Sequence, residues 1–253
     1  MKSFKSAASK GKKTEYYDDA EFKKALVKVR LNQIENAFED LSDFLEDFPN
    51  SNRRAEVYMT LAQLYIRVEK MDEALSAYKK SFAEAKDDKI WKMAGSNLTK
   101  LAYDMGLYNL SLTTAQAYLQ KFPDSADEAN KRIIVGKCYA KLGQTELAVS
   151  YLKKLKQEVD SESEPEIQFA IGEIYFNQKN YEMAIIEFLK IPVMSKRTKL
   201  QWEASALYYA GNSYEKMGKI DEAVRMYEEI IKRPGILADL KKAARDRIKK
   251  IKS

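Results

Sequence analysis

A pattern of about 37 residues recurs along the chain and limits what the chain can fold into. The small residues near the start of the second half of each copy lie 37, 37, 37, 36 and 39 residues apart, and they are Ala37, Ala74, Ser111, Ala148, Ala184 and Ala223. Around them the same order of apolar, small and aromatic residues returns, as in 61–78, 135–152, 171–188 and 210–227. A period of this length is the signature of a repeat architecture, in which each copy buries its apolar face against its neighbours.

The composition indicates that each copy is helical. Only 9 of the 253 residues are Gly and 5 are Pro, and the apolar residues recur at helical spacing. Long helices joined by short connections have these properties. We expect Gly106, Gly143 and Gly218 to end the first helix of their copies, because glycine readily adopts the positive φ that ends a helix. The sequence therefore predicts an all-α protein.

The residues within each copy resemble the tetratricopeptide repeat. A small first-helix residue (Ala62, Gly136, Gly172, Gly211) is followed three positions later by tyrosine (Tyr65, Tyr139, Tyr175, Tyr214), and the second-helix alanine is followed four positions later by Tyr78, Leu152, Phe188 or Tyr227. The small residue lets the two helices approach closely, and we expect the second-helix alanine to lie opposite the gap. The resemblance implies a right-handed α-solenoid over residues 15–235, with about six units near 15–49, 55–88, 91–123, 129–160, 165–192 and 202–235.

The two ends of the chain differ in charge from its body. Residues 1–13 carry five lysines and no acid, residues 232–253 carry nine basic residues and two acids, and the 218 residues between them have a net charge of −6. We expect a disordered basic tail over 1–14 and a basic capping helix over 236–253. The apolar face of that helix is predicted to hold Ile236, Leu240, Ala243 or Ala244, Ile248 and Ile251.

Three interpretations of these basic ends remain open. They are solvated, they contact an acidic protein or an anionic membrane surface, or they contact nucleic acid. Nucleic acid is the least favoured, because no aromatic residues alternate with the basic ones.

The chain has no histidine and a single cysteine, Cys138. This composition removes the commonest general base and the commonest metal ligand, and it leaves no partner for a disulfide or a zinc site. The sequence therefore predicts no catalytic residue, no metal and no cofactor. Cys138 lies in an apolar run and is expected in the core.

The resemblance also implies where a partner binds, because the first helices of successive units line the concave face of a solenoid. Aromatic and apolar side chains there are expected to anchor a partner's helix or extended segment, while polar side chains hold its backbone or charges. The predicted anchors are Ile66, Tyr103, Ile133, Phe169, Phe176 and Tyr209, and the predicted polar residues are Gln63, Asn97, Lys100, Lys137 and Asn212. Alternatively, several of these residues fill the seams between helices. The carboxylate clamp of the chaperone-cofactor subclass is absent, because only Asn97 fits it.

The sequence therefore predicts a non-catalytic protein-interaction scaffold. The F-P-x-S junctions at 48–51 and 122–125 are similar to those of bacterial cell-envelope tetratricopeptide proteins of the outer-membrane-assembly lipoprotein and cell-division-coordinator kind, which implies a subunit of an envelope assembly. The alternatives are a regulatory or substrate-presenting subunit of an enzyme complex and a cytoplasmic adaptor or co-chaperone. An upstream signal or lipobox would place the protein in the bacterial periplasm or envelope, and otherwise we expect the cytoplasm. No oligomeric state follows from the sequence.

Overall fold

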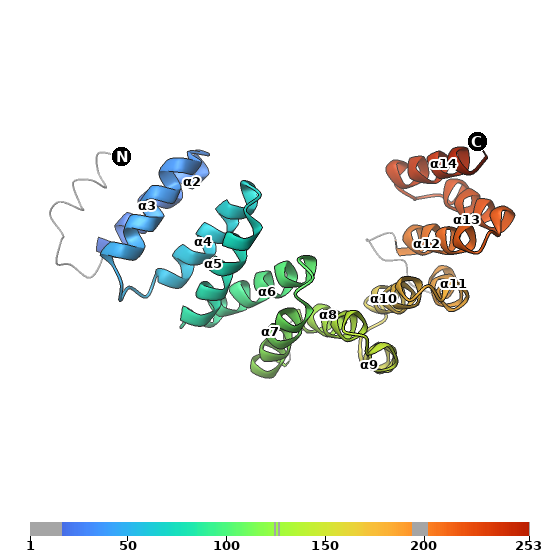
Figure 1. Ribbon diagram of the computed structural model, residues 1–253, viewed down its shortest axis with the longest axis horizontal. Helices are drawn as coiled ribbons and strands as arrows, with labels where there is room; N and C mark the ends of the chain where they lie inside the picture. Colours follow the sequence, from blue (N-terminus) through green and yellow to red (C-terminus); the bar gives the residue numbers. More distant parts are fainter. Residues whose placement is uncertain (1–16, 124, 126, 194–201, 253) are drawn as a thin grey trace. The chain divides into compact units, whose positions relative to one another are not determined.

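The computed structural model describes residues 17–123, 125, 127–193 and 202–252, and within them it is built from α-helices (Figure 1). The helices are α2 (Tyr17–Arg30), α3 (Ile34–Asp47), α4 (Arg54–Arg67), α5 (Met71–Glu84), α6 (Asp88–Asp104), α7 (Tyr108–Lys121), α8 (Glu128–Lys141), α9 (Thr145–Glu158), α10 (Glu164–Asn177), α11 (Tyr181–Leu189), α12 (Trp202–Lys216), α13 (Ile220–Lys232) and α14 (Ala238–Lys252), with a 3₁₀ turn at Ile191–Val193. The predicted all-α fold of paired helices is confirmed. The predicted tail, residues 1–14, lies outside the described residues.

The helices pair in chain order, and we call the first helix of each pair helix A and the second helix B. The A helices are α2, α4, α6, α8, α10 and α12, and the B helices are α3, α5, α7, α9, α11 and α13. The chain forms two compact units, Met1–Tyr118 and Leu119–Ser253. The first has one core shared by α2 to α6, and the second has three smaller clusters that follow one another from α8 to α14. Within each unit, every helix pair buries its apolar side against the next pair.

In the last three repeats, a glycine of helix A lies against a large residue of helix B. A Cβ atom on Gly172 would lie 2.5 Å from the ring of Phe188, and one on Gly136 would lie 2.6 Å from the side chain of Leu152. The side chain nearest to the gap is therefore the large residue four positions after the helix-B alanine, and not the alanine that we had placed there. In every repeat the two positions are 16 residues apart, and the six pairs are Ala25/Leu41, Ala62/Tyr78, Thr99/Ala115, Gly136/Leu152, Gly172/Phe188 and Gly211/Tyr227.

The third repeat reverses this size pattern. Thr99 stands at the small position of helix A, and Ala115 stands at the large position of helix B; both are fully buried. Ser111, at the position of the helix-B alanine, donates a 2.8 Å hydrogen bond to the backbone oxygen of Thr99. The larger helix-A residue is therefore balanced by a smaller helix-B residue, and a buried hydroxyl group links α6 to α7.

All six turns between helices A and B contain one residue of positive φ. Gly106, Gly143 and Gly218 have φ of 76°, 84° and 73°, as predicted, and the other three turns place Asn32, Glu69 and Lys179 at φ of 56°, 58° and 60°. In the turn at Lys179, the next backbone N–H donates to the Tyr175 oxygen at 3.0 Å, which is the Schellman arrangement. The turns therefore have one geometry whether or not they contain glycine.

The last helix, α14, covers the apolar end of the final pair. Ala244 is fully buried among residues of α12 and α13, and Ile236, Leu240, Ile248 and Ile251 pack around it. Ala243 is exposed, so Ala244 is the alanine that faces the core. The first helix pair is joined differently, because Lys28 of α2 forms a 2.7 Å ion pair with Asp40 of α3 at a position where four of the later repeats have tyrosine.

Candidate functional site

The predicted site residues lie on the A helices of both compact units. In the first unit, Gln63 and Ile66 of α4 are exposed, Asn97 and Tyr103 of α6 are half-buried, and Lys100 of α6 is exposed. The two helices contact each other, and these five residues form the predicted surface of the first unit. We call this surface the helix-A face of the first unit.

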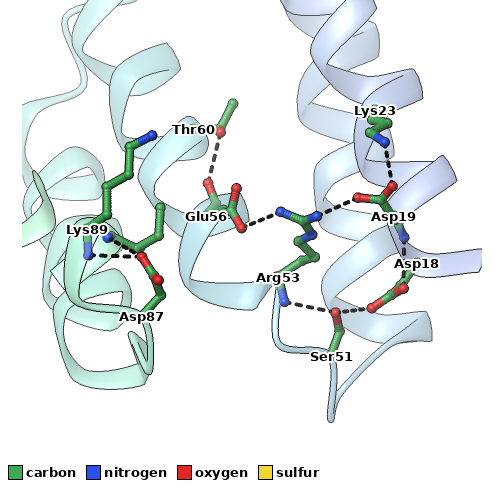
Figure 2. A network of polar contacts seen from close by, with 10 residues as sticks. Asp18, Asp19, Lys23, Ser51, Arg53, Glu56, Thr60, Asp87 and Lys89 are labelled. Carbon is green, nitrogen blue, oxygen red and sulfur yellow. Dashed lines mark hydrogen bonds and ion pairs between the residues drawn. The ribbon is translucent and has the colours of Figure 1, made fainter. Parts of the chain in front are cut away.

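A network of charged side chains lies at the start of this face (Figure 2). The Arg53 guanidinium bridges α2 and α4, because it donates to the carboxylates of Asp19 and Glu56 at 2.7 Å each. Ser51 of the preceding loop donates to Asp18 at 2.5 Å and accepts from the Arg53 backbone N–H at 3.0 Å. The network thus holds the B-to-A connection against the neighbouring A helix.

The Asp19 carboxylate in this network is stabilised in its charged form. A hydrogen bond from Lys23 and the nearby positive charge of Arg53 hold the pKa of Asp19 below its ordinary value. Sequence reasoning missed this network, because Arg53 and Ser51 lie in a connection and occupy no repeat lining position. The only signal was the S-x-R order after the F-P junction.

Two other predicted residues of the first unit have intramolecular partners. Lys100 forms a 2.6 Å ion pair with Asp104 one turn further along α6. The ring of Tyr103 meets that of Tyr108 edge-on, with centroids 5.5 Å apart. Both pairs are formed by residues close in sequence, and a partner could reach both side chains at the surface.

In the second unit, the helix-A face is formed by α8, α10 and α12. Lys137 of α8 forms a 2.8 Å ion pair with Glu173 of α10, and both side chains are about one-quarter exposed. Phe176 of α10 meets Tyr209 of α12 edge-on at a centroid distance of 5.5 Å, and both rings are half-buried. An ion pair and an aromatic contact therefore join successive A helices on one surface.

Tyr209 lies at the centre of an aromatic cluster. Its ring is 5.3 to 5.5 Å from three phenylalanine rings, those of Phe169, Phe176 and Phe188. Burial, together with the negative charge of Glu173, raises the pKa of the Tyr209 hydroxyl. The hydroxyl is therefore neutral and can donate or accept a hydrogen bond at this surface.

Two predicted anchors of the second unit do not reach its surface. Ile133 is 3% exposed and Phe169 is 7% exposed. Phe169 packs between Phe188, Trp202 and Tyr209, with centroids 5.2 to 5.3 Å apart, and Ile133 belongs to the core of α8 to α10. For these two residues the seam-filling alternative describes the structure, and they support the face from beneath.

Asn212 lies in a second polar cluster, at the end of the same face. The Tyr227 hydroxyl lies 2.9 Å from the side-chain oxygen of Asn212 and 2.6 Å from the Glu215 carboxylate, and the two acceptors share its one proton. Arg247 of α14 donates to both oxygens of Glu215 at 2.7 Å. Sequence reasoning had not predicted this contact, because Arg247 belongs to the basic helix and its partner lies 32 residues earlier.

The face of the second unit offers chemistry for recognition. It combines half-buried aromatic rings, a neutral hydroxyl group, an amide and a close ion pair, which is a composition typical of surfaces that bind protein segments. Within the described ranges, no group of three or more His, Cys, Asp or Glu residues is arranged to hold a metal ion. None of the described helices is long and apolar enough to cross a bilayer.

Sequence models of the tetratricopeptide repeat match five segments of the chain, at residues 19–51, 55–88, 134–160, 165–191 and 205–235. Together these segments cover more than half of the sequence. A TPR repeat-containing protein of Methanocaldococcus jannaschii is 27% identical to this chain over 197 residues, which are 78% of this chain and 31% of the relative. The chain thus spans about a third of the length of that curated relative.

Solved structures share the fold. A tetratricopeptide repeat protein from Parabacteroides merdae matches with a TM-score of 0.58 and 13% identity, over 100% of this chain and 91% of that one. A signal-transduction ATPase with a tetratricopeptide repeat sensor, from Pyrococcus horikoshii, matches with a TM-score of 0.60 and 21% identity, over 94% of this chain and 39% of that one. The repeat matches, the curated relative and the paired helices agree, and the chain belongs to the tetratricopeptide-repeat family.

Proposed function

We propose that this protein is a non-catalytic scaffold that binds a helix or an extended segment of a partner protein on the helix-A face of its second unit. Tetratricopeptide-repeat folds act in general as protein-interaction scaffolds. The observation that carries the proposal is the contact of Phe176 with Tyr209 beside the Lys137–Glu173 ion pair. Partly exposed rings next to oriented charges form the anchors of protein interfaces.

Each group has a role in this proposal. Phe176 and Tyr209 contribute apolar area to the partner's side chains, while the Tyr209 hydroxyl and the Asn212 amide hold its polar groups. Lys137 and Glu173 select a partner segment that places opposite charges along the face. In the first unit, Gln63, Ile66, Asn97, Lys100 and Tyr103 are proposed to extend recognition to a further stretch of the partner.

The absence of histidine from the sequence supports a non-catalytic role, because the usual general base is missing. A second candidate function is a regulatory or substrate-presenting part of a larger enzyme system. The observation that favours it is that in both the archaeal relative and the signal-transduction ATPase the matched repeats are less than two-fifths of a longer chain. A thermal shift produced by a small molecule, with no partner protein present, would favour this candidate. Membership of a bacterial envelope assembly remains a prediction from the F-P-x-S junctions.

The binding proposal is tested with peptides selected from a displayed library against the wild-type chain. Phe176→Ala is expected to raise the dissociation constant by about tenfold or more, because truncating an interface aromatic removes a dominant anchor. Lys137→Ala is expected to weaken peptides that carry an acid by a few-fold. Isothermal titration calorimetry measures both changes, and circular dichroism checks that the variants remain helical.

Matched controls lie on the B helices. Ile186 of α11 is 51% exposed, and Lys153 of α9 is exposed, so Ile186→Ala and Lys153→Ala remove similar groups outside the proposed face. Both controls are expected to bind like the wild type. A photo-crosslinking residue at the exposed position 177 should also attach to the peptide, whereas one at position 186 should not. The proposed face would be disproved if the peptides bound the control variants more weakly than the wild type but bound Phe176→Ala with unchanged affinity.

A further inference from the structure

The outer face of α3 carries a row of carboxylates. Glu35, Glu39, Asp43 and Asp47 follow one another at four-residue steps, and all four are exposed. The helix holds six acidic residues and no basic one. Among the described residues, none of these four carboxylates forms an ion pair; the only acid of α3 with such a partner is Asp40. We call these four residues the acidic row.

This arrangement is unfavourable for an isolated helix. Like charges four residues apart repel each other on a helix surface. Asp47 also lies in the last turn of α3, where the helix dipole disfavours a negative charge. A cationic surface placed against the acidic row would relieve both effects.

The outer face of α14 carries the opposite charge. Lys242, Arg245 and Lys249 lie at spacings of three and four residues on one side of the helix, and all three are exposed. Within the described part of the chain they form no ion pair, whereas Arg247 of the same helix is held by Glu215. One acid, the exposed Asp246, lies beside them. We call these three cations the basic row.

We propose that the chain self-associates head to tail, with the basic row of one copy on the acidic row of α3 in a second copy. The two rows are complementary in sign and in spacing, because both present about one charge per helical turn of about 5.4 Å. The acidic row is about 18 Å long and the basic row about 10 Å, so three cations can lie opposite three carboxylates. This association does not depend on the partner binding proposed above.

A second copy fits these rows better than the other anionic partners of α14. The apolar side of α14 is already buried against α12 and α13, so it is not free to insert into a bilayer. A nucleic acid would occupy the basic row and leave the acidic row of α3 without a partner. Since the two rows lie on different helices, each added copy leaves one acidic and one basic row free, and the assembly can extend as a chain or close as a ring.

Sedimentation equilibrium of the full chain tests the proposal. At about 0.05 M salt the average mass of the wild type should rise with protein concentration, and at about 0.5 M it should fall toward that of the monomer, because salt screens exposed charges. A variant with Glu35→Lys, Glu39→Lys and Asp43→Lys should associate at least about tenfold more weakly. A variant with Lys242→Glu, Arg245→Glu and Lys249→Glu should lose association to the same degree.

The decisive step is to mix these two variants. The first keeps a native basic row and the second keeps a native acidic row, so the mixture should associate although neither variant does so alone. A control variant with Lys79→Glu, Lys153→Glu and Arg225→Glu has the same net charge as the α14 variant, but its changes lie at exposed positions of other helices. It should associate like the wild type.

Three results would overturn the proposal. The wild type could be monomeric at every concentration in low salt, including the case in which it binds anionic vesicles or DNA through α14. The control variant could be as defective as the α14 variant, which would show a general effect of net charge. The mixture of the two row variants could remain monomeric, which would show that the rows do not meet.

Discussion

Three turn residues other than glycine adopt the left-handed backbone conformation, which a side chain disfavours. They are Asn32, Glu69 and Lys179. Their φ values lie between 56° and 60°, and they occupy the turn position at which the other three repeats have glycine. For residues other than glycine, the left-handed region costs about 1–2 kcal/mol. The glycine turns could be predicted from sequence, whereas Lys179 and Glu69 could not, because neither residue type signals a positive φ.

Replacing Lys179 with glycine should therefore stabilise the protein. We expect Lys179→Gly to raise the free energy of unfolding by about 0.5–1 kcal/mol, since the relief of strain exceeds the greater freedom of glycine in the unfolded chain. Urea denaturation followed by circular dichroism measures the change. The neighbour Gln178 has a φ of −79°, so Gln178→Gly should lower stability. If Lys179→Gly and Gln178→Gly changed the free energy of unfolding equally, the backbone at Lys179 would not be strained.

At the scale of the helix pair, closure depends on a small and a large residue 16 positions apart. The repeat spacing predicted that the helices pair, but it did not predict which helix-B side chain enters the gap between them. Which side chain enters depends on its size relative to the space that the facing helix leaves, and the spacing of residues does not report that space. For the same reason, counting repeat positions wrongly predicted Phe169 as a surface anchor. The large rings of Trp202 and Tyr209 in the following pair cover it.

The pair Gly172/Phe188 gives a direct test of closure. Gly172→Ala should lower the free energy of unfolding by about 1–2 kcal/mol, because the added methyl group would lie 2.5 Å from a fully buried ring that must shift. Phe188→Leu should restore part of this loss when it is combined with Gly172→Ala. The coupling energy from the double-mutant cycle, measured by urea denaturation, checks the contact. Strictly additive effects would show that the two residues do not meet.

At the scale of the whole molecule, the sequence predicted repeats between two basic ends, and the structure shows how the C-terminal end is held. Apolar periodicity was sufficient to predict that α14 packs on the last pair. The contact between Arg247 and Glu215 was not predictable, because charged residues on a basic helix show no preference in sequence for one acid. This contact uses neither the residues that define the repeat nor the apolar core, and it joins α14 to α12.

Removing this contact should loosen the end of the molecule first. Arg247→Ala leaves the Glu215 carboxylate, which is only 14% exposed, without its cation. We expect stability to fall by about 1–3 kcal/mol and amide hydrogen exchange to accelerate in α14 more than in α4 or α5. Arg225→Ala removes an exposed arginine of α13 that lies outside the basic row, so it serves as the control and should leave exchange unchanged. If amide exchange accelerated equally in all helices, the Arg247–Glu215 contact would not stabilise α14 in particular.

The 16-residue separation within each helix pair also has a consequence for how the chain folds. Both members of a closing pair lie within one short stretch of sequence, so each pair can form its central contact without waiting for distant residues. Proteins rich in such local contacts fold quickly, and repeat proteins can begin folding at any unit and extend from it. During synthesis, the first helix pairs can therefore close while the later repeats are still being translated.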